Sequence, residues 1–209
     1  MDKATYGLIG VVLGFLLPVV KDLWIQRSKN QKNIEYLCIH VTCMLDRFVS
    51  GCSAVVSDDG LYHGQPDKDG YSRIQVSAPV FEPEKLEVEW KSLPANIMYE
   101  ILNFPLNLES ANSFIDSTFE HAASPPDYSE GFEERQYQYA LLGVRANVLA
   151  LKLRSLSKLP QKEIGDWDSI QYMKDQKLKI EEVRKERYKQ QGKMFKELSS
   201  SKANNKKQA

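Results

Sequence analysis

The chain has 209 residues, of which 42% are hydrophobic and 27% are charged, and its 28 basic and 28 acidic residues leave no net charge. This composition is typical of a chain that folds around a packed core, so it argues against an intrinsically disordered protein. The length leaves room for one domain of ordinary size after a short N-terminal segment, and argues against a second independent core.

The charges are distributed unevenly along the chain. Residues 1–32 hold five Lys/Arg and two Asp/Glu, and residues 174–209 hold twelve and five. The middle of the chain, residues 33–173, then holds 11 basic and 21 acidic residues. An acidic body between two basic ends favours contact with anionic surfaces.

The first predicted element is a membrane-spanning helix from Thr5 to Ile25. Residues 6–20 contain no charged or strongly polar side chain. A helix of 21 residues is about 31 Å long, close to the thickness of the hydrocarbon layer. Tyr6 and Trp24 then lie about 27 Å apart and serve as interface anchors, one at each membrane surface. A buried core helix is the alternative, because 15 apolar residues would also suit one.

The cations around this segment predict its orientation. Lys21, Arg27, Lys29 and Lys32 follow the apolar centre, whereas only Lys3 precedes it. Because basic flanks stay on the cytoplasmic side, we expect a single-pass protein of the cell (inner) membrane with its N-terminus out and its C-terminal domain cytoplasmic. Residues 1–29 then form the anchor.

Small residues form a stripe on this predicted membrane helix. At 100° per residue, Gly7, Gly10 and Gly14 share one side of the helix with Pro18, which is expected to kink it. Gly10 and Gly14 form a Gly-x-x-x-Gly pair that allows two helices to approach closely, so one interpretation is membrane-helix packing in a homodimer. The other is ordinary composition, because glycine is frequent in membrane helices.

The domain after the anchor, residues 30–173, is predicted to be a helical bundle. Apolar residues recur at steps of three and four in an amphipathic helix that continues from the anchor: Ile34, Leu37, Val41, Met44, Phe48, Cys52 and Val55. Residues 57–83 are rich in Gly, Pro and Asp and read as an exposed, irregular loop with a short strand at 73–76. Its acids are expected to be solvated turn residues.

Three further helices are expected before residue 160. Ser92 is a candidate cap for a helix through Asn103, and Pro105 is expected to separate it from a second helix that ends near His121. The next helix begins at Glu130 and stops before Pro160. Its predicted core stripe is Tyr137, Leu141, Val144, Val148 and Leu151.

A charged helix from about Trp167 to Leu198, capped by Asp166, is the last predicted element. Its apolar residues form no sustained heptad seam, so we expect it to leave the bundle after about Met173 as a basic helix, followed by a disordered tail within 174–209. A coiled coil remains an alternative. The basic segment could meet a protein partner or an anionic surface, or lie solvated with no partner, and its interleaved acids make nucleic acid the weaker alternative.

No catalytic, cofactor-binding or metal-binding residue is predicted. The segment Cys38-x-His40-x-x-Cys43 is the one cluster of metal-ligand type, but Cys38 and His40 point about 200° apart on a helix. Three cysteines fit reduced, buried thiols better than a disulfide framework. We therefore expect a membrane-tethered helical interaction or scaffold module. The alternative is a membrane-anchored enzyme, or its regulatory subunit, that carries no recognisable motif.

Overall fold

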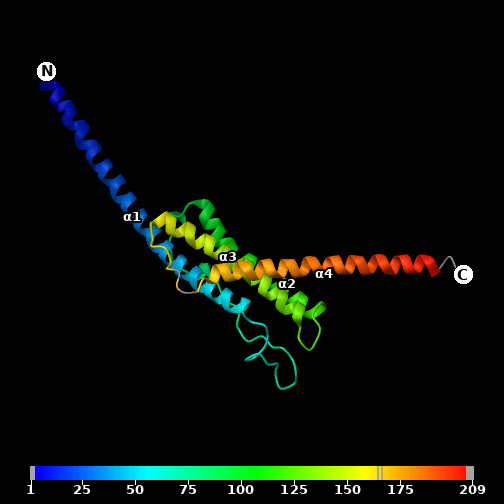
Figure 1. The fold of residues 1–209 in the computed structure, drawn as a ribbon. Helices are drawn as coiled ribbons and strands as arrows, with labels where there is room; N and C mark the ends of the chain where they lie inside the picture. Colours follow the sequence, from blue (N-terminus) through cyan, green and yellow to red (C-terminus); the bar gives the residue numbers. More distant parts are fainter. Residues whose placement is uncertain (1–2, 164, 166, 206–209) are drawn as a thin grey trace.

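The computed structural model describes residues 3–163, 165 and 167–205. Side chains are described at 18, 20–163, 165 and 167–195, and at the other positions only the helical backbone. The protein is mainly α-helical, as predicted (Figure 1), and the described residues form four α-helices: α1 (Lys3–Val56), α2 (Ala95–His121), α3 (Ser129–Ser157) and α4 (Ser169–Asn205). Two short 3-10 helices, η1 (Pro83–Lys85) and η2 (Trp90–Ser92), precede α2.

Helix α1 is one uninterrupted helix that contains both the predicted membrane segment and the predicted amphipathic helix. The amphipathic stripe is confirmed, because its residues face the core: Leu37, Val41, Phe48, Cys52 and Val55 are buried, and Ile34 and Met44 are partly buried. No glycine or proline occurs between Val19 and Ser50 to interrupt the helix. The backbone that builds the core is therefore continuous with the N-terminal segment.

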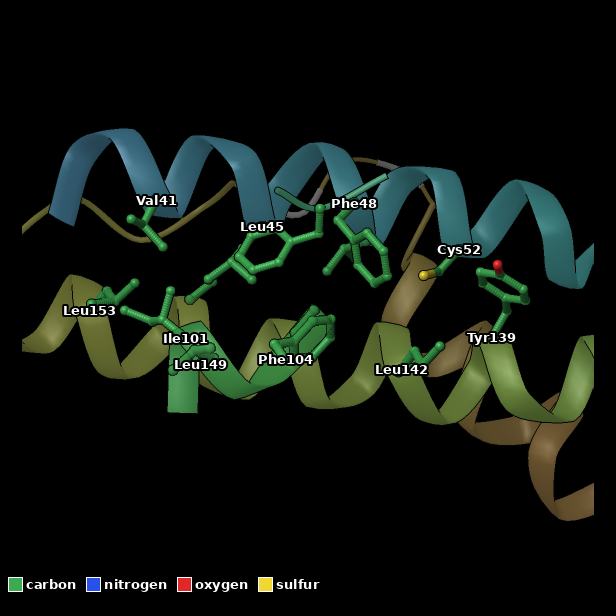
Figure 2. Close-up of a cluster of buried hydrophobic side chains, with 14 of the residues drawn as sticks. Val41, Leu45, Phe48, Cys52, Ile101, Phe104, Tyr139, Leu142, Leu149 and Leu153 are labelled. Atoms are coloured by element: carbon green, nitrogen blue, oxygen red, sulfur yellow. The ribbon is translucent and has the colours of Figure 1, made fainter. Parts of the chain in front are cut away.

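Helix α3 is the centre of the body, and α1, α2 and α4 all pack against it. Figure 2 shows the main layer of this core, in which Leu45 and Phe48 of α1 face Leu142 and Leu149 of α3. Phe104 of α2 closes the layer with its ring edge-on to Phe48 at 5.3 Å between centroids. The body is a helical bundle built around one shared helix.

The predicted core stripe of α3 is on the wrong side of the helix. Val148 and Leu151 are exposed, and the buried positions follow a second three-and-four pattern: Phe132, Arg135, Tyr139, Leu142, Ala146, Leu149 and Leu153. Both stripes have helical spacing because α3 is apolar on several sides, and spacing alone does not distinguish them. The buried side of α3 is the one that carries small residues, because Ala140, Gly143 and Ala150 let α1 approach closely.

Gly143 marks the point where three helices meet. A Cβ atom there would lie 2.5 Å from the Sδ of Met173 on α4 and 2.9 Å from the Cβ of Cys52 on α1. Both distances are shorter than van der Waals contact allows, so the hydrogen atom of glycine is what fits between α1 and α4.

Pro105 does not separate two helices, contrary to the prediction. It lies inside α2, which runs unbroken from Ala95, with Pro94 rather than Ser92 at the N-cap. A proline in a helix interior costs about 3 kcal/mol. Packing on both sides of it, by the buried Ile101, Phe104, Ala111 and Ile115, offsets that cost.

The segment between α1 and α2 contains no strand among the described residues, so the strand predicted at 73–76 is absent. The backbone N–H groups of Gln75 and Val76 instead donate to the Asp58 carboxylate, at 3.0 Å each. The Phe81 side chain inserts into the core beside Phe104. The loop is therefore irregular in backbone but fixed to the body at two points.

Helix α4 differs from the prediction at both ends. It begins at Ser169, where Asp168 accepts the N–H groups of Ile170 and Gln171 at 2.9 and 3.0 Å; the predicted cap, Asp166, lies outside the described residues. It stays against α3 well beyond Met173, with Ile180 buried and Arg184 paired to α3. Its backbone is helical through Asn205, a stretch that includes most of the tail predicted as disordered, and residues 206–209 of that tail lie outside the described part.

Candidate functional site

The N-terminal part of α1 projects from the bundle as a single helix (Figure 1). From Val20 to Lys32 every described side chain is exposed, including the apolar Leu23 and Ile25. Trp24, the predicted interface anchor, is 72% exposed. A helix that presents large apolar side chains away from its own body is suited to contact with a membrane or another protein.

The other residues predicted for this helix lie where only the backbone is described. Tyr6, Gly7, Gly10 and Gly14 belong to α1, but their side-chain surroundings are outside the described part of the chain. The glycine stripe and the outer aromatic anchor therefore stay predictions.

One helix in the described part is long and apolar enough to cross a membrane. The stretch that meets this criterion is Val20–Val56, and half of its apolar window is buried in the body. A core helix satisfies the same criterion. The membrane span predicted at Thr5–Ile25 thus remains a proposal that this finding neither supports nor opposes.

A group of cations lies between the projecting part of α1 and the bundle. Lys21, Arg27, Lys29 and Lys32 are exposed, and within the described residues none of them forms an ion pair. The first contact with the body is the Asn33 side chain, whose Nδ2 donates to Oε2 of Glu89 at 2.8 Å. These four cations therefore lie near the bundle, and no described acidic residue of the bundle pairs with them.

An ionic cluster fastens α4 to the first turns of α3. Arg184 donates from Nε to Glu133 at 2.8 Å and from Nη2 to Glu134 at 2.7 Å. Arg187 donates from Nη2 to the second oxygen of Glu133 at 2.7 Å. The Arg184 guanidinium also lies over the Tyr137 ring, 4.7 Å from its centroid. These ion pairs hold the two helices together.

The ion pairs of this cluster lower the pKa of Glu133. Burial alone would raise the pKa of the carboxyl group, but hydrogen bonds from Arg184 and Arg187 outweigh burial and hold its pKa below the ordinary value. Glu133 is therefore ionised at neutral pH, and the contact of α4 with α3 carries a titratable component.

Beyond this cluster, α4 extends past the end of α3. The two helices run antiparallel, since Met173 packs at Gly143 and Arg187 pairs near the first turn of α3. After Arg187 the helix continues to Asn205 with four lysines and one glutamate. This end projects from the bundle in Figure 1, with Tyr188 and Met194 exposed. It is the second projecting element of the molecule.

Asp58 and Arg135 form a buried ion pair that joins the long loop to α3. Arg135 Nη1 donates to Asp58 Oδ2 at 2.8 Å, and the side chains are 4% and 1% exposed. Asp58 Oδ1 accepts the backbone N–H of Gly60 at 3.0 Å, and Arg135 also donates to the carbonyl of Val76. The expectation of a solvated turn is wrong for Asp58. All its oxygens are engaged within the protein, so the group is structural.

The other acids and the cysteines of interest show no convergent arrangement. Asp67 closes its own turn by accepting the N–H groups of Asp69 and Tyr71 at 2.9 and 2.8 Å. Cys38 and Cys52 are buried, and burial raises the pKa of each thiol, whereas Cys43 is exposed. Within the described residues no three His, Cys, Asp or Glu side chains are placed to hold a metal ion.

One hollow lies beside the start of α4. Its volume is about 600 Å³, and its lining includes Ser50, Ser53, Arg154 and Trp167 but no described His or Cys. Arg154 is occupied by Asp46 at 2.5 Å and by the carbonyl of Pro160. The Ser50 hydroxyl donates to its own helix backbone. Among the described residues, no serine of this lining hydrogen-bonds to a lysine or a carboxylate, so the hollow shows no paired nucleophile and base.

Sequence reasoning predicted a helix at each end of the chain, but it placed the departure of the last helix from the bundle too early, at Met173, and missed the contacts that hold that helix. Asp58, Glu133, Arg135 and Arg184 are the residues it did not assign correctly, and each pairs with a residue between 50 and 77 positions away. The comparisons add no function: the sequence matches no family model, and it has no significant similarity to curated proteins or solved structures.

Proposed function

We propose that this protein is a membrane-tethered helical scaffold. In this proposal the segment Thr5–Ile25 anchors the chain, the bundle is a rigid spacer, and the projecting end of α4 binds a protein partner or an anionic surface. The observation that carries the proposal is the continuity of α1, whose N-terminal part projects with exposed apolar residues and whose C-terminal part is core. Such a helix couples a tether to a folded body without a flexible linker.

The proposed orientation places the bundle in the cytoplasm. The four exposed cations at 21–32 lie on the bundle side of the apolar segment, where basic residues favour retention on the cytoplasmic face. A reporter that works only in the cytoplasm should be active when fused to the C-terminus. One that works only outside should be inactive, and the reverse pattern would overturn the orientation.

A scaffold role is favoured over an enzymatic one by the state of the charged groups. The buried carboxylate of Asp58 is fully engaged, and no described serine in the hollow beside the start of α4 is hydrogen-bonded to a lysine or a carboxylate. The exposed surface, by contrast, carries two projecting helices of basic character.

Membrane fractionation of the full-length protein tests the tether. We expect the chain to stay with membranes in high salt and alkaline carbonate, because a spanning helix is held by its apolar surface. Val12→Arg with Leu16→Arg should release it, since each arginine at a helix centre costs about 3 kcal/mol on insertion scales. Ile74→Arg with Val80→Arg, on the exposed loop, is the matched control and should leave the protein in the membrane. Parent protein in the soluble fraction would refute the tether.

A further inference from the structure

The outer face of α2 carries an apolar stripe with no charge on it. Tyr99, Leu106 and Phe114 are 67%, 58% and 65% exposed, and Leu102 is exposed beside them. At 100° per residue these four lie within about 60° of Tyr99, on the side of α2 opposite the buried Ile101, Phe104, Ala111 and Ile115. The other residues on this stripe, between Ala95 and Ser117, are Ala, Asn and Ser. A solvent-facing stripe of this kind is typical of an interface.

The charge around this stripe restricts what can cover it. From Ser92 to Glu134 the sequence holds eight acidic residues and no Lys or Arg. Glu109 and Asp116 are exposed along one edge of the stripe, and neither forms an ion pair in the described part of the chain. Two α2 faces would bring these acids together, and an anionic membrane would repel them. The matching partner is a basic helix with exposed apolar residues.

The chain itself contains such a helix in the projecting end of α4. Residues 188–205 carry four lysines and one glutamate, and Tyr188 and Met194 are exposed. This end is about 26 Å long, and the stripe of α2 from Ala95 to Ser117 is about 33 Å long. The end of α4 runs past the end of α3 and away from the bundle, so in this structure its last turns do not lie along their own α2 (Figure 1).

We propose that the projecting end of α4 docks on the outer face of α2 in a second copy of this chain. The apolar stripe of α2 receives the apolar side chains of α4, and Glu109 and Asp116 face Lys189 and Lys193. The contact is reciprocal in a two-fold dimer, so each copy contributes one α4 and one α2. This inference does not depend on the membrane tether, because both surfaces belong to the bundle and its C-terminal helix.

Two charge-reversed variants of the full-length protein test the docking in detergent. Variant one carries Glu109→Lys and Asp116→Lys, and variant two carries Lys189→Glu and Lys193→Glu. Donor and acceptor dyes on the exposed Cys43 thiol report association by energy transfer. Each variant should associate with itself about tenfold more weakly than the parent, because attraction becomes repulsion. A mixture of the two should recover association, since both reciprocal contacts are again between opposite charges.

Matched controls separate this contact from other ways of associating. Glu84→Lys with Glu87→Lys makes the same change of net charge on exposed residues outside α2 and should leave self-association unchanged. Leu106→Asp should weaken association, whereas Val80→Asp, an exposed apolar residue of the loop, should not. The proposal is overturned if the parent, both variants and their mixture associate equally. A dimer made only by membrane helices would give that result. A parent that shows no self-association overturns the proposal as well.

Discussion

Two ionic clusters in the same turn of α3 have opposite characters. Arg135 lies in a closed site, where Asp58 and the Val76 carbonyl take up its hydrogen bonds away from water. Glu133 and Glu134 lie nearer the surface, where Arg184 and Arg187 reach them from α4. A fully buried pair is costly to break because one unpaired charge remains, and a partly exposed pair costs less because water can reach the group that is left. The Asp58–Arg135 pair therefore fixes the loop to α3. The pairs of Glu133 and Glu134 hold α4 less tightly.

Removing one member of the buried pair should give the largest effect. Arg135→Met leaves the Asp58 carboxylate buried with no cation, and we expect it to lower the free energy of unfolding by about 3 to 5 kcal/mol. Urea denaturation of the full-length protein in mild detergent, followed by circular dichroism, measures the change. Arg145→Met replaces an exposed arginine of the same helix and should change stability by less than about 0.5 kcal/mol. Equal effects of the two would contradict the role of the buried pair.

The packing that holds the start of α4 should rank second. Gly143→Val places side-chain atoms where Met173 and Cys52 already meet, and should cost about 1 to 3 kcal/mol. Gly192→Val in the projecting end of α4 has no atom within 4 Å of its added Cβ and provides the control. The same denaturation measurement should show the first variant destabilised and the second unchanged or slightly stabilised, because glycine is a poor helix former.

Breaking the ion pairs between α4 and Glu133 and Glu134 should have a smaller effect on stability, confined to α4. Arg184→Gln with Arg187→Gln removes the three ion pairs between α4 and Glu133 and Glu134, and we expect a loss of about 1 to 2 kcal/mol. Hydrogen exchange should increase in α4 after Ile180 and stay unchanged in the core of α1. Lys177→Gln, which removes only an ion pair within α4, is the control. Unchanged exchange in the double variant would show that packing alone holds α4.

Acid should weaken the same cluster, and this is the smallest effect expected. The pKa of Glu133 lies below its ordinary value of 4.5, so its contribution is complete above that pH. It is lost as pH falls from there through the lowered pKa, because the protonated carboxyl group no longer pairs with the arginines. Exchange in α4 should therefore rise below pH 4.5 in the parent. Glu133→Gln should show faster exchange than the parent at neutral pH and a smaller change with acid, because it lacks the titrating group.

Periodicity predicted the helical class and the core face of α1, because one side of that helix is apolar and the other is not. It failed for α3, where apolar residues occur on several sides and Ala140 and Gly143 decide which side is buried. The ionic contacts could not be predicted, because Asp58 and Arg135 are 77 positions apart and only the fold brings them together. The break predicted at Pro105 was wrong because the packing of α2 against the body outweighs the low helix propensity of proline.

We propose that one helix, α1, both spans a membrane and builds the core of the bundle. Nitroxide labels placed one at a time along α1 in lipid bilayers, with Cys43 changed to Ser, test it most directly. We predict that Leu13→Cys is accessible to oxygen dissolved in the lipid, that Gln31→Cys is accessible to a water-soluble relaxant, and that Trp24→Cys lies at the boundary between them. Equal access of the water-soluble relaxant to all three positions would contradict the account.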